Sequence, residues 1–189
     1  MAIQSHSLEV TTGAAVQATP ASAAQWKVDP SKSRLGFAVQ WSGEALNAVF
    51  RSWTANISFD PADLAHSKAV VTIDLSSEDS GASENDDGLK GAEGFAIDHF
   101  PSATFETTGF TPGKNGNAYV ANGRLSLHGM TKALALPFIL TISGNTAHMV
   151  GRAVVSRLDF GLGTGEWAGE TPVAHAVTIT VDLTATKAS

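Results

Sequence analysis

The sequence of 189 residues contains no cysteine, which excludes disulfides, thiolate catalysis and cysteine-bound metal or iron–sulfur centres. Charged residues are also scarce, since they make up 16% of the chain, where about a quarter is usual. The net charge is −6, and no cluster of Lys and Arg is present. Nucleic acid is therefore not an expected partner, because cationic side chains that neutralise phosphates supply most of that affinity.

Long apolar runs and catalytic signatures are missing as well. No stretch of about 18 apolar residues occurs, so the sequence predicts no transmembrane helix. It contains no GxSxG, HExxH or HxH motif, and the glycine-rich segment 161–165 lacks the Lys and the following helix of a phosphate loop. The histidines are scattered and predict no metal site: His6, His66, His99, His128, His148 and His175.

A period-two pattern of apolar residues dominates what is present. The segment from Asn122 to Leu140 reads NGRLSLHGMTKALALPFIL, in which apolar residues alternate over 125–127 and again over 134–140. Gly129 interrupts the alternation, and we expect residues 130–132 to form the bend. Such a pattern around a glycine-containing turn indicates a β-hairpin with one buried face.

Further alternating segments extend this pattern over the rest of the chain, so that we expect eight or nine strands in one domain. The predicted strands outside the hairpin include 26–29, 35–41, 49–60, 69–75, 104–109, 149–158 and 173–184. Residues 42–48 are expected to be a connection, and residues 85–96 are the best helix candidate. Antiparallel strands avoid exposed edges by closing into a barrel, which at eight strands either packs solid or holds one ligand.

The first 25 residues carry no strand or helix pattern, and we expect a disordered tail or a signal-peptide remnant there. The tripeptide from Ala21 to Ala23 matches a signal-peptidase site, but the basic start and apolar segment of a signal peptide are missing. Two explanations stay open. The motif is the remnant of an export signal whose start has been replaced, or it is an accidental match in an Ala-rich stretch.

Four segments, in this order, resemble the YceI-like family of lipocalin-like β-barrels. They are WKVDPSKSRLGFAV, GLKGAEGFAIDHFPSATFE, NGRLSLHGMTKALALPF, and SRLDFGLGTGEW together with the final VTITVDLTA. The resemblance covers residues 26–186 and implies an all-β, antiparallel lipocalin-like barrel of about eight strands with one short helix and an elongated apolar pore.

The same resemblance implies a function and a location. Characterised members bind long-chain lipids, particularly polyprenyl compounds such as isoprenoid quinone precursors, and many are exported to the periplasm. We therefore expect a periplasmic or secreted protein. The sequence predicts no definite cofactor, and a polyprenyl lipid or quinone is the molecule expected to co-purify. Some members are associated with cytochrome b561-type membrane proteins, and a homodimer stays open as well.

Aromatic residues favour such a pore. Nine Phe and four Trp exceed what the ends of a plain barrel need. Core packing explains any one of them better than a ligand does, whereas the set as a whole favours a lined interior. The candidate ligand-binding residues are Phe37, Val39, Trp41, Trp53, Ile57, Phe59, Ile73, Leu89, Phe95, Phe100, Phe105, Leu125, Leu127, Leu136, Phe138, Phe160 and Trp167.

A ligand in this pore needs no charged anchor, because each buried methylene contributes roughly 0.8 kcal/mol. Arg124, Arg152 and Arg157 are possible partners for an anionic head group. Each is better explained as a surface or rim residue with a local carboxylate partner.

Three functions follow, and lipid binding without enzymatic activity ranks first, with the ligand's head near a mouth formed by segments 76–100 and 160–170. The second is an interaction module for a membrane redox protein, motivated by an exposed-looking Trp167 on a glycine-rich loop. The third is a hydrolase that uses His99 or His128.

Overall fold

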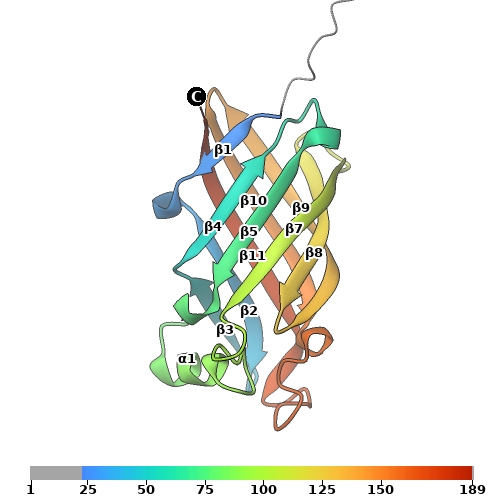
Figure 1. Cartoon of the computed structure of the whole chain (residues 1–189). Helices are drawn as coiled ribbons and strands as arrows, with labels where there is room; N and C mark the ends of the chain where they lie inside the picture. The colour runs from blue at the N-terminus through green and yellow to red at the C-terminus, as the bar shows by residue number, and fades with distance from the viewer. Residues whose placement is uncertain (1–22, 189) are drawn as a thin grey trace, which may run out of the picture.

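Eleven strands join edge to edge in one antiparallel sheet that closes on itself in the computed structural model, which describes residues 23–188. The barrel is elongated, with α1 and the loop before β11 at one end and β1 and the C-terminus at the other (Figure 1). In chain order the elements are β1 (Gln25–Val28), η1 (Pro30–Lys32), β2 (Arg34–Trp41), β3 (Glu44–Phe50), β4 (Trp53–Ser58), η2 (Leu64–His66), β5 (Lys68–Asp74), η3 (Leu75–Ser77), β6 (Glu78–Asp79), α1 (Ser83–Lys90), β7 (Ser102–Pro112), β8 (Ala118–Leu127), β9 (Met130–Ser143), β10 (Thr146–Ser156), η4 (Arg157–Phe160) and β11 (Val173–Lys187).

The ring itself has eight strand positions. Paired strands run in the order β1-β4-β5-β7-β8-β9-β10-β11, and the pairing of β1 with β11 closes the circle. The other three strands extend positions of this ring. β1 and β2 both pair with β11, β3 continues into β4, and β6 follows β5 and pairs with β3. The predicted fold, a closed antiparallel barrel of about eight strands with one short helix, is confirmed.

Three strand positions are interrupted, between β1 and β2, between β3 and β4, and between β5 and β6. Local chemistry explains the first and the last of these interruptions. Pro30 opens η1, and the carboxylate of Asp29 accepts a hydrogen bond from the amide of Ser31 at 3.0 Å. The carboxylate of Asp74 accepts from the amide of Ser76, also at 3.0 Å, at the start of η3. Asp at such positions favours turns because its side chain replaces a backbone acceptor.

The third interruption, at residues 51–52, corrects the predicted strand boundaries. The expected connection over 42–48 is mostly β3, and the expected strand over 49–60 is split before Trp53. Phe50 and Trp53 both line the interior although they are three residues apart, because the break shifts the alternation. Glu44 and Asn47 of β3 are exposed, and these polar residues gave the sequence the character of a loop.

A β-bulge in β7 has the same effect two strand positions away from β4. The register with β8 shifts between Thr107 and Gly109. Phe105 and Phe110 are five residues apart, so strict alternation would place them on opposite faces, yet both line the interior.

The central hairpin is formed by β8 and β9, but the predicted bend over 130–132 is wrong. Leu127 pairs directly with Met130, so the turn consists of His128 and Gly129 alone. Their φ angles are 53° and 72°, and two positive φ values are typical of the type I′ turn that matches strand twist. The side chain of His128 is held by a contact of 3.0 Å between Nδ1 and the carbonyl oxygen of Phe160.

This turn makes a stability prediction. Gly129→Ala should lower the free energy of unfolding by about 2 kcal/mol, because a left-handed conformation costs an L-residue about 1–2 kcal/mol and the new Cβ is crowded. That Cβ would lie 2.9 Å from the ring of Phe100. Gly144→Ala is the matched control, with φ of 58° and no atom within 4 Å of its Cβ. Urea denaturation of both variants measures the difference, and equal losses would contradict the steric part of the argument.

The helix is shorter than predicted and belongs to a segment that fills a gap in the wall. α1 ends at Lys90 rather than continuing to residue 96, and the amide of Phe95 donates to the carbonyl of Leu89 at 2.6 Å. Gly94 permits this close return, since a Cβ there would lie 2.0 Å from the Leu89 oxygen. Among the described strands β6 pairs only with β3, and residues 80–100 connect it to β7.

The barrel begins slightly before the predicted domain start at residue 26. β1 starts at Gln25, Ala23 is already buried, and its carbonyl oxygen accepts a hydrogen bond from Ser58 Oγ at 3.0 Å. Residues 1–22, which hold most of the expected tail and two of the three residues of the signal-peptidase motif, lie outside the described residues.

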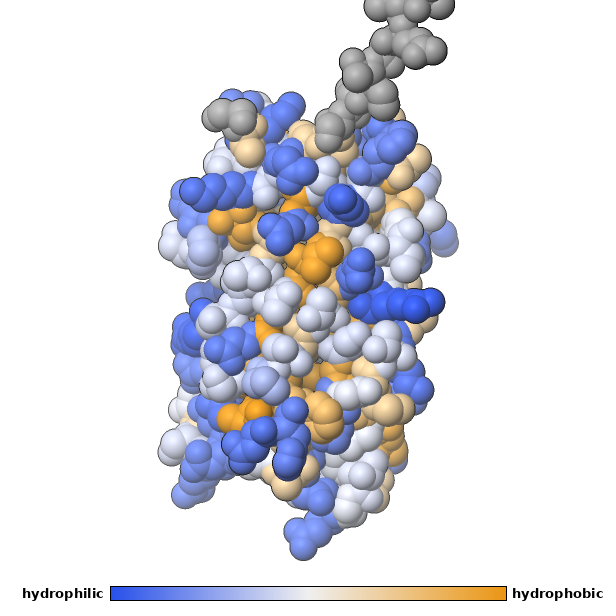
Figure 2. Space-filling model, viewed as in Figure 1, coloured by the Kyte–Doolittle hydropathy of each residue, from blue (hydrophilic) through white to orange (hydrophobic). Residues whose placement is uncertain are grey.

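Apolar side chains are directed into the barrel, and the face in Figure 2 is mostly hydrophilic or neutral with small, scattered hydrophobic areas. Within residues 23–188, no helix is long and apolar enough to cross a membrane.

Candidate ligand cavity

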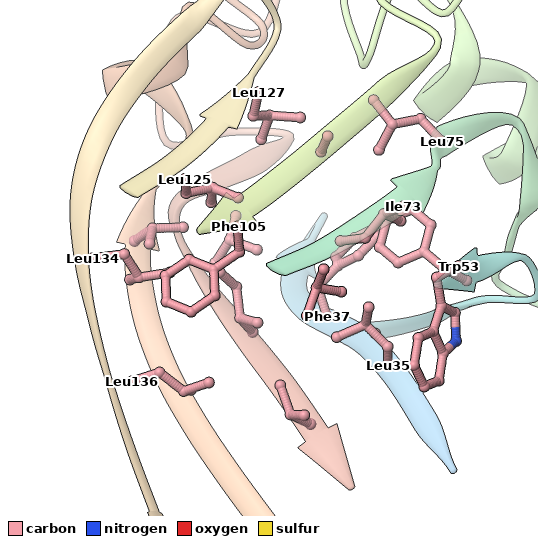
Figure 3. A pocket seen from close by; sticks show the side chains of 18 of the residues that line it. Leu35, Phe37, Trp53, Ile73, Leu75, Phe105, Leu125, Leu127, Leu134 and Leu136 are labelled. Atoms are coloured by element: carbon pink, nitrogen blue, oxygen red, sulfur yellow. The ribbon is translucent and has the colours of Figure 1, made fainter. Parts of the chain in front are cut away.

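A cavity of about 250 Å³ runs inside the barrel, and almost all of its wall is aliphatic or aromatic (Figure 3). For comparison, an apolar cavity of about 150 Å³ is enough to bind benzene. Both Val173 and Ala185 of β11 line it, and twelve residues of strand span about 40 Å, or about 30 Å along the axis of a barrel with strands tilted by about 40°. The centre of the barrel is therefore a long, apolar hollow and not a solid core.

Sixteen of the seventeen candidate ligand-binding residues lie on this wall. They come from nearly every part of the barrel, which explains why segments distant in sequence share one surface. These residues are Phe37, Val39, Trp41, Trp53, Ile57, Phe59, Ile73, Leu89, Phe95, Phe105, Leu125, Leu127, Leu136, Phe138, Phe160 and Trp167. Contact of each with a ligand stays a prediction.

Phe100 is the exception, because it does not line the cavity. The centroid of its ring lies 4.6 Å from that of the His128 ring, and the ring covers Gly129 in the β8–β9 turn. From the sequence, Phe95, Phe100 and Phe105 are all expected to line the interior. The turn after Ala96, where φ is 49°, separates Phe100 from the inward-facing Phe95.

Several wall residues were missed by the sequence analysis. Phe50 and Phe110 were missed because the break after β3 and the bulge in β7 change which side chains face inward. Trp26 stands in a strand too short to show alternation. The weak signal that was available is Phe50, whose position out of phase with Trp53 already indicated an irregularity.

One end of the cavity, near β1 and the C-terminus, is closed by packed aromatic rings. The ring of Phe59 lies 5.0 Å from that of Phe110 and 5.5 Å from that of Tyr119, and Tyr119 stacks on Phe138 at 5.6 Å. Trp26 Nε1 donates to the carbonyl oxygen of Phe59 at 2.9 Å, so its polar atom is satisfied. Edge-to-face packing of this kind is favourable beyond simple burial, so these rings stabilise the closure of this end.

The opposite end is closed by two segments that touch through few contacts. Trp41 and Trp167 pack edge to face with ring centroids 5.1 Å apart, and both rings lie within 4 Å of the place where Gly88 of α1 would carry a Cβ. The amide of Gly165 donates to a carboxylate oxygen of Glu93 at 3.1 Å. The prediction that Trp167 is exposed is therefore wrong. Its partial burial removes the observation that motivated an interaction module.

Arg157 is a buried structural residue and not a rim residue with a carboxylate partner. Its guanidinium donates to the carbonyl oxygens of Leu162, Gly163, Gly169, Val173 and Ala174 at 2.8–3.1 Å, and to that of Trp167. Burial lowers the pKa of Arg157, while Glu170 and Glu93 oppose that shift. These bonds tie the loop between η4 and β11 to the barrel.

Glu78 is a buried carboxylic acid at the edge of the same region. It is 2% exposed, and among residues 23–188 neither of its carboxylate oxygens has a hydrogen-bond partner. Burial, with a smaller contribution from the negative charge of Asp86, raises the pKa of Glu78 to about 7. Burial of this kind disfavours the charged form of a carboxyl group and so favours the neutral form.

Histidines do not assemble a reactive centre within the described residues. No group of three His, Asp or Glu side chains there has the arrangement of a metal site. His99 is exposed and His128 contacts the backbone carbonyl of Phe160, and within residues 23–188 neither makes a hydrogen bond or ion pair with a carboxylate. Arg124 and Arg152 are exposed on the outer face. The hydrolase hypothesis gains no support from this arrangement.

Comparisons with known proteins agree with the barrel. The sequence profile of a family described as YceI-like domain matches residues 26–185. A UPF0312 protein of Photorhabdus laumondii is 34% identical over 133 residues, which cover 68% of each chain. The crystal structure of BcnA from Burkholderia cenocepacia has a TM-score of 0.81 and 31% identity, covering 85% of this chain and all of that one. A structure described as a polyisoprenoid binding domain from Saccharophagus degradans has a TM-score of 0.68 at 14% identity, covering 87% of this chain and 99% of that one.

Proposed function

The chain belongs to the YceI-like family, and we propose that its barrel binds the apolar tail of a long-chain polyisoprenoid or isoprenoid-quinone-like lipid. The observation that carries this proposal is the long cavity with an almost wholly apolar wall. The neighbouring structure described as a polyisoprenoid binding domain supports it, since the two barrels share a fold. We propose carriage or storage of the lipid as the role that such binding serves.

An uncharged head group suits this cavity better than a diphosphate. Arg157 and Glu93 are the ionisable residues on the wall, and Arg157 already donates to six carbonyl oxygens. Glu93 stands at the mouth, where its negative charge opposes an anion. Transfer of an unpaired anion into this interior is far more costly than transfer of a neutral quinone or alcohol.

Burial of the tail supplies the affinity. Each methylene that leaves water contributes roughly 0.8 kcal/mol, so ten methylenes contribute roughly 8 kcal/mol before the cost of association. Binding of this kind needs no catalytic step, and we assign none to the cavity.

Extraction and binding experiments test this function. We expect organic extraction and native mass spectrometry of the purified protein to find a bound neutral lipid with an apolar tail. Titration with a polyprenol should then show binding, and titration with the matching polyprenyl diphosphate should show at least tenfold weaker binding. Equal affinity for the two would contradict the neutral head group. No binding of either, at several chain lengths, would contradict the lipid function itself.

A further inference from the structure

Glu78 stands where strand pairing leaves the barrel wall incomplete. It belongs to β6, which holds only two residues and pairs with β3 through Phe50 opposite Glu78 and Val49 opposite Asp79. Residues opposite each other in an antiparallel pair point to the same side of the sheet. Phe50 lines the cavity, so the carboxyl group of Glu78 also points inward, where the segment 80–100 covers it.

That segment, which we call the cap, is residues 80–100. Leu89 and Phe95 attach it to the cavity wall, with the ring centroid of Phe95 5.9 Å from that of Phe37 and 6.0 Å from that of Phe50. At the end of the cap, Phe100 packs against His128 in the β8–β9 turn. Its helix has eight residues and no side-chain N-cap, so α1 has little stability of its own. Displacement of the cap would open the cavity at the Trp41 and Trp167 end.

We propose that Glu78 is a pH-sensitive latch: the protonated side chain lets the cap close over the cavity, and its ionisation releases the cap. Control of ligand release by the latch rests on the proposed lipid function, whereas cap opening itself does not. The physical reason is that an ionised carboxylate buried without a hydrogen-bond partner is costly, and opening of the cap returns it to water.

The charges around Glu78 agree with this direction. Asp86 and Lys90 face it from α1, and Asp79 follows it in β6. Asp86 accepts hydrogen bonds from the amide and hydroxyl of Ser80, at 2.9 and 2.5 Å. Asp79 pairs with Arg51, at 2.7 Å. Lys90 lowers the pKa of Glu78, but burial and the two carboxylates outweigh it.

The sign of the pH effect follows from the raised pKa. In the closed state the pKa is about 7, whereas the ordinary value is 4.5. Closure is therefore most favourable below the ordinary pKa, weakens as pH rises towards 7, and is constant above the closed-state value. Between pH 5.5 and 8 the ratio of open to closed molecules should rise by about thirtyfold.

Release of phenylnaphthylamine, a neutral fluorescent apolar probe, tests the latch by stopped-flow fluorescence at pH 5.5–8. We expect the wild-type release rate to rise by about thirtyfold and to level off above pH 7. Glu78→Gln should show the slow rate at every pH, because the glutamine side chain does not ionise. Glu84→Gln, in an exposed residue of the same helix, should keep the wild-type profile. A flat wild-type profile, or an unchanged profile in Glu78→Gln, would overturn the proposal.

Hydrogen exchange decides the latch without any ligand. The amides of Phe95 and Ala96, which donate to Leu89 and Gly91, should lose protection from pH 5.5 to 8 after correction for intrinsic rates, while β10 amides keep theirs. Unchanged protection of the cap would overturn the latch even if Glu78→Gln failed to fold. Failure of the probe to bind at every pH would contradict the lipid function instead.

Discussion

Replacement of Ala121 by Trp should weaken lipid binding by about a thousandfold. Ala121 is buried in β8, lies between its register partners Phe110 and Leu136, and lines the cavity. An indole ring at this position occupies space that a tail would fill. Exclusion of five methylenes costs about 4 kcal/mol at roughly 0.8 kcal/mol each, and 1.4 kcal/mol corresponds to tenfold in affinity.

The matched control is Ala135→Trp on the neighbouring strand. Ala135 is exposed on the outer face of β9, opposite Asn122, so the same substitution adds its ring to solvent. We expect its affinity for a polyprenol, measured by titration, to stay within twofold of wild type. Tight binding by Ala121→Trp, in a variant with a normal circular dichroism spectrum, would mean that the lipid does not occupy the barrel.

Arg157→Met should lower the free energy of unfolding by about 4 kcal/mol. This value is within the range for removal of a buried charged group whose partners are left unpaired. Methionine preserves the length of the side chain but donates no hydrogen bond, so six carbonyl oxygens lose their donor. The loss is smaller than the sum of six bonds, because the loop before β11 can move and expose these oxygens to water.

Arg152→Met on β10 is the control for this change. Arg152 is exposed, and within residues 23–188 its guanidinium makes no hydrogen bond or ion pair. Its substitution should change stability by less than about 0.5 kcal/mol. Urea denaturation measures both variants. If Arg157→Met lost less than 1 kcal/mol, the carbonyl contacts would not hold this loop in place.

The two segments that close the Trp41 and Trp167 end of the cavity are held in place in different ways. Arg157 secures the loop on one side of the mouth through many hydrogen bonds, whereas the cap on the other side is held by the side chains of Leu89, Phe95 and Phe100 and by a few polar contacts. This asymmetry is the reason that the cap, and not the loop, is expected to move. Arg157→Met should therefore loosen the mouth at every pH, and Glu78→Gln should remove only its pH dependence.

Alternating apolar residues determined the barrel and most of its inner wall, because the side-chain period of a strand assigns each residue to a face without any knowledge of its partner. Leu125, Leu127 and Leu136 were placed correctly for this reason. The same rule failed at Phe50 and Phe110, since one interruption or one bulged residue reverses the faces, and both features depend on pairing with other strands.

Charge and burial were decided by the tertiary structure alone. Arg157 and Glu78 have ordinary neighbours in sequence, and their burial results from carbonyl groups, strands and a cap that come from other parts of the chain. Sequence patterns report whether a residue tends to face inward, but not how much space remains there. That the interior is hollow, and which end of it can open, follows only from how all eight strand positions and the two mouth segments meet in space.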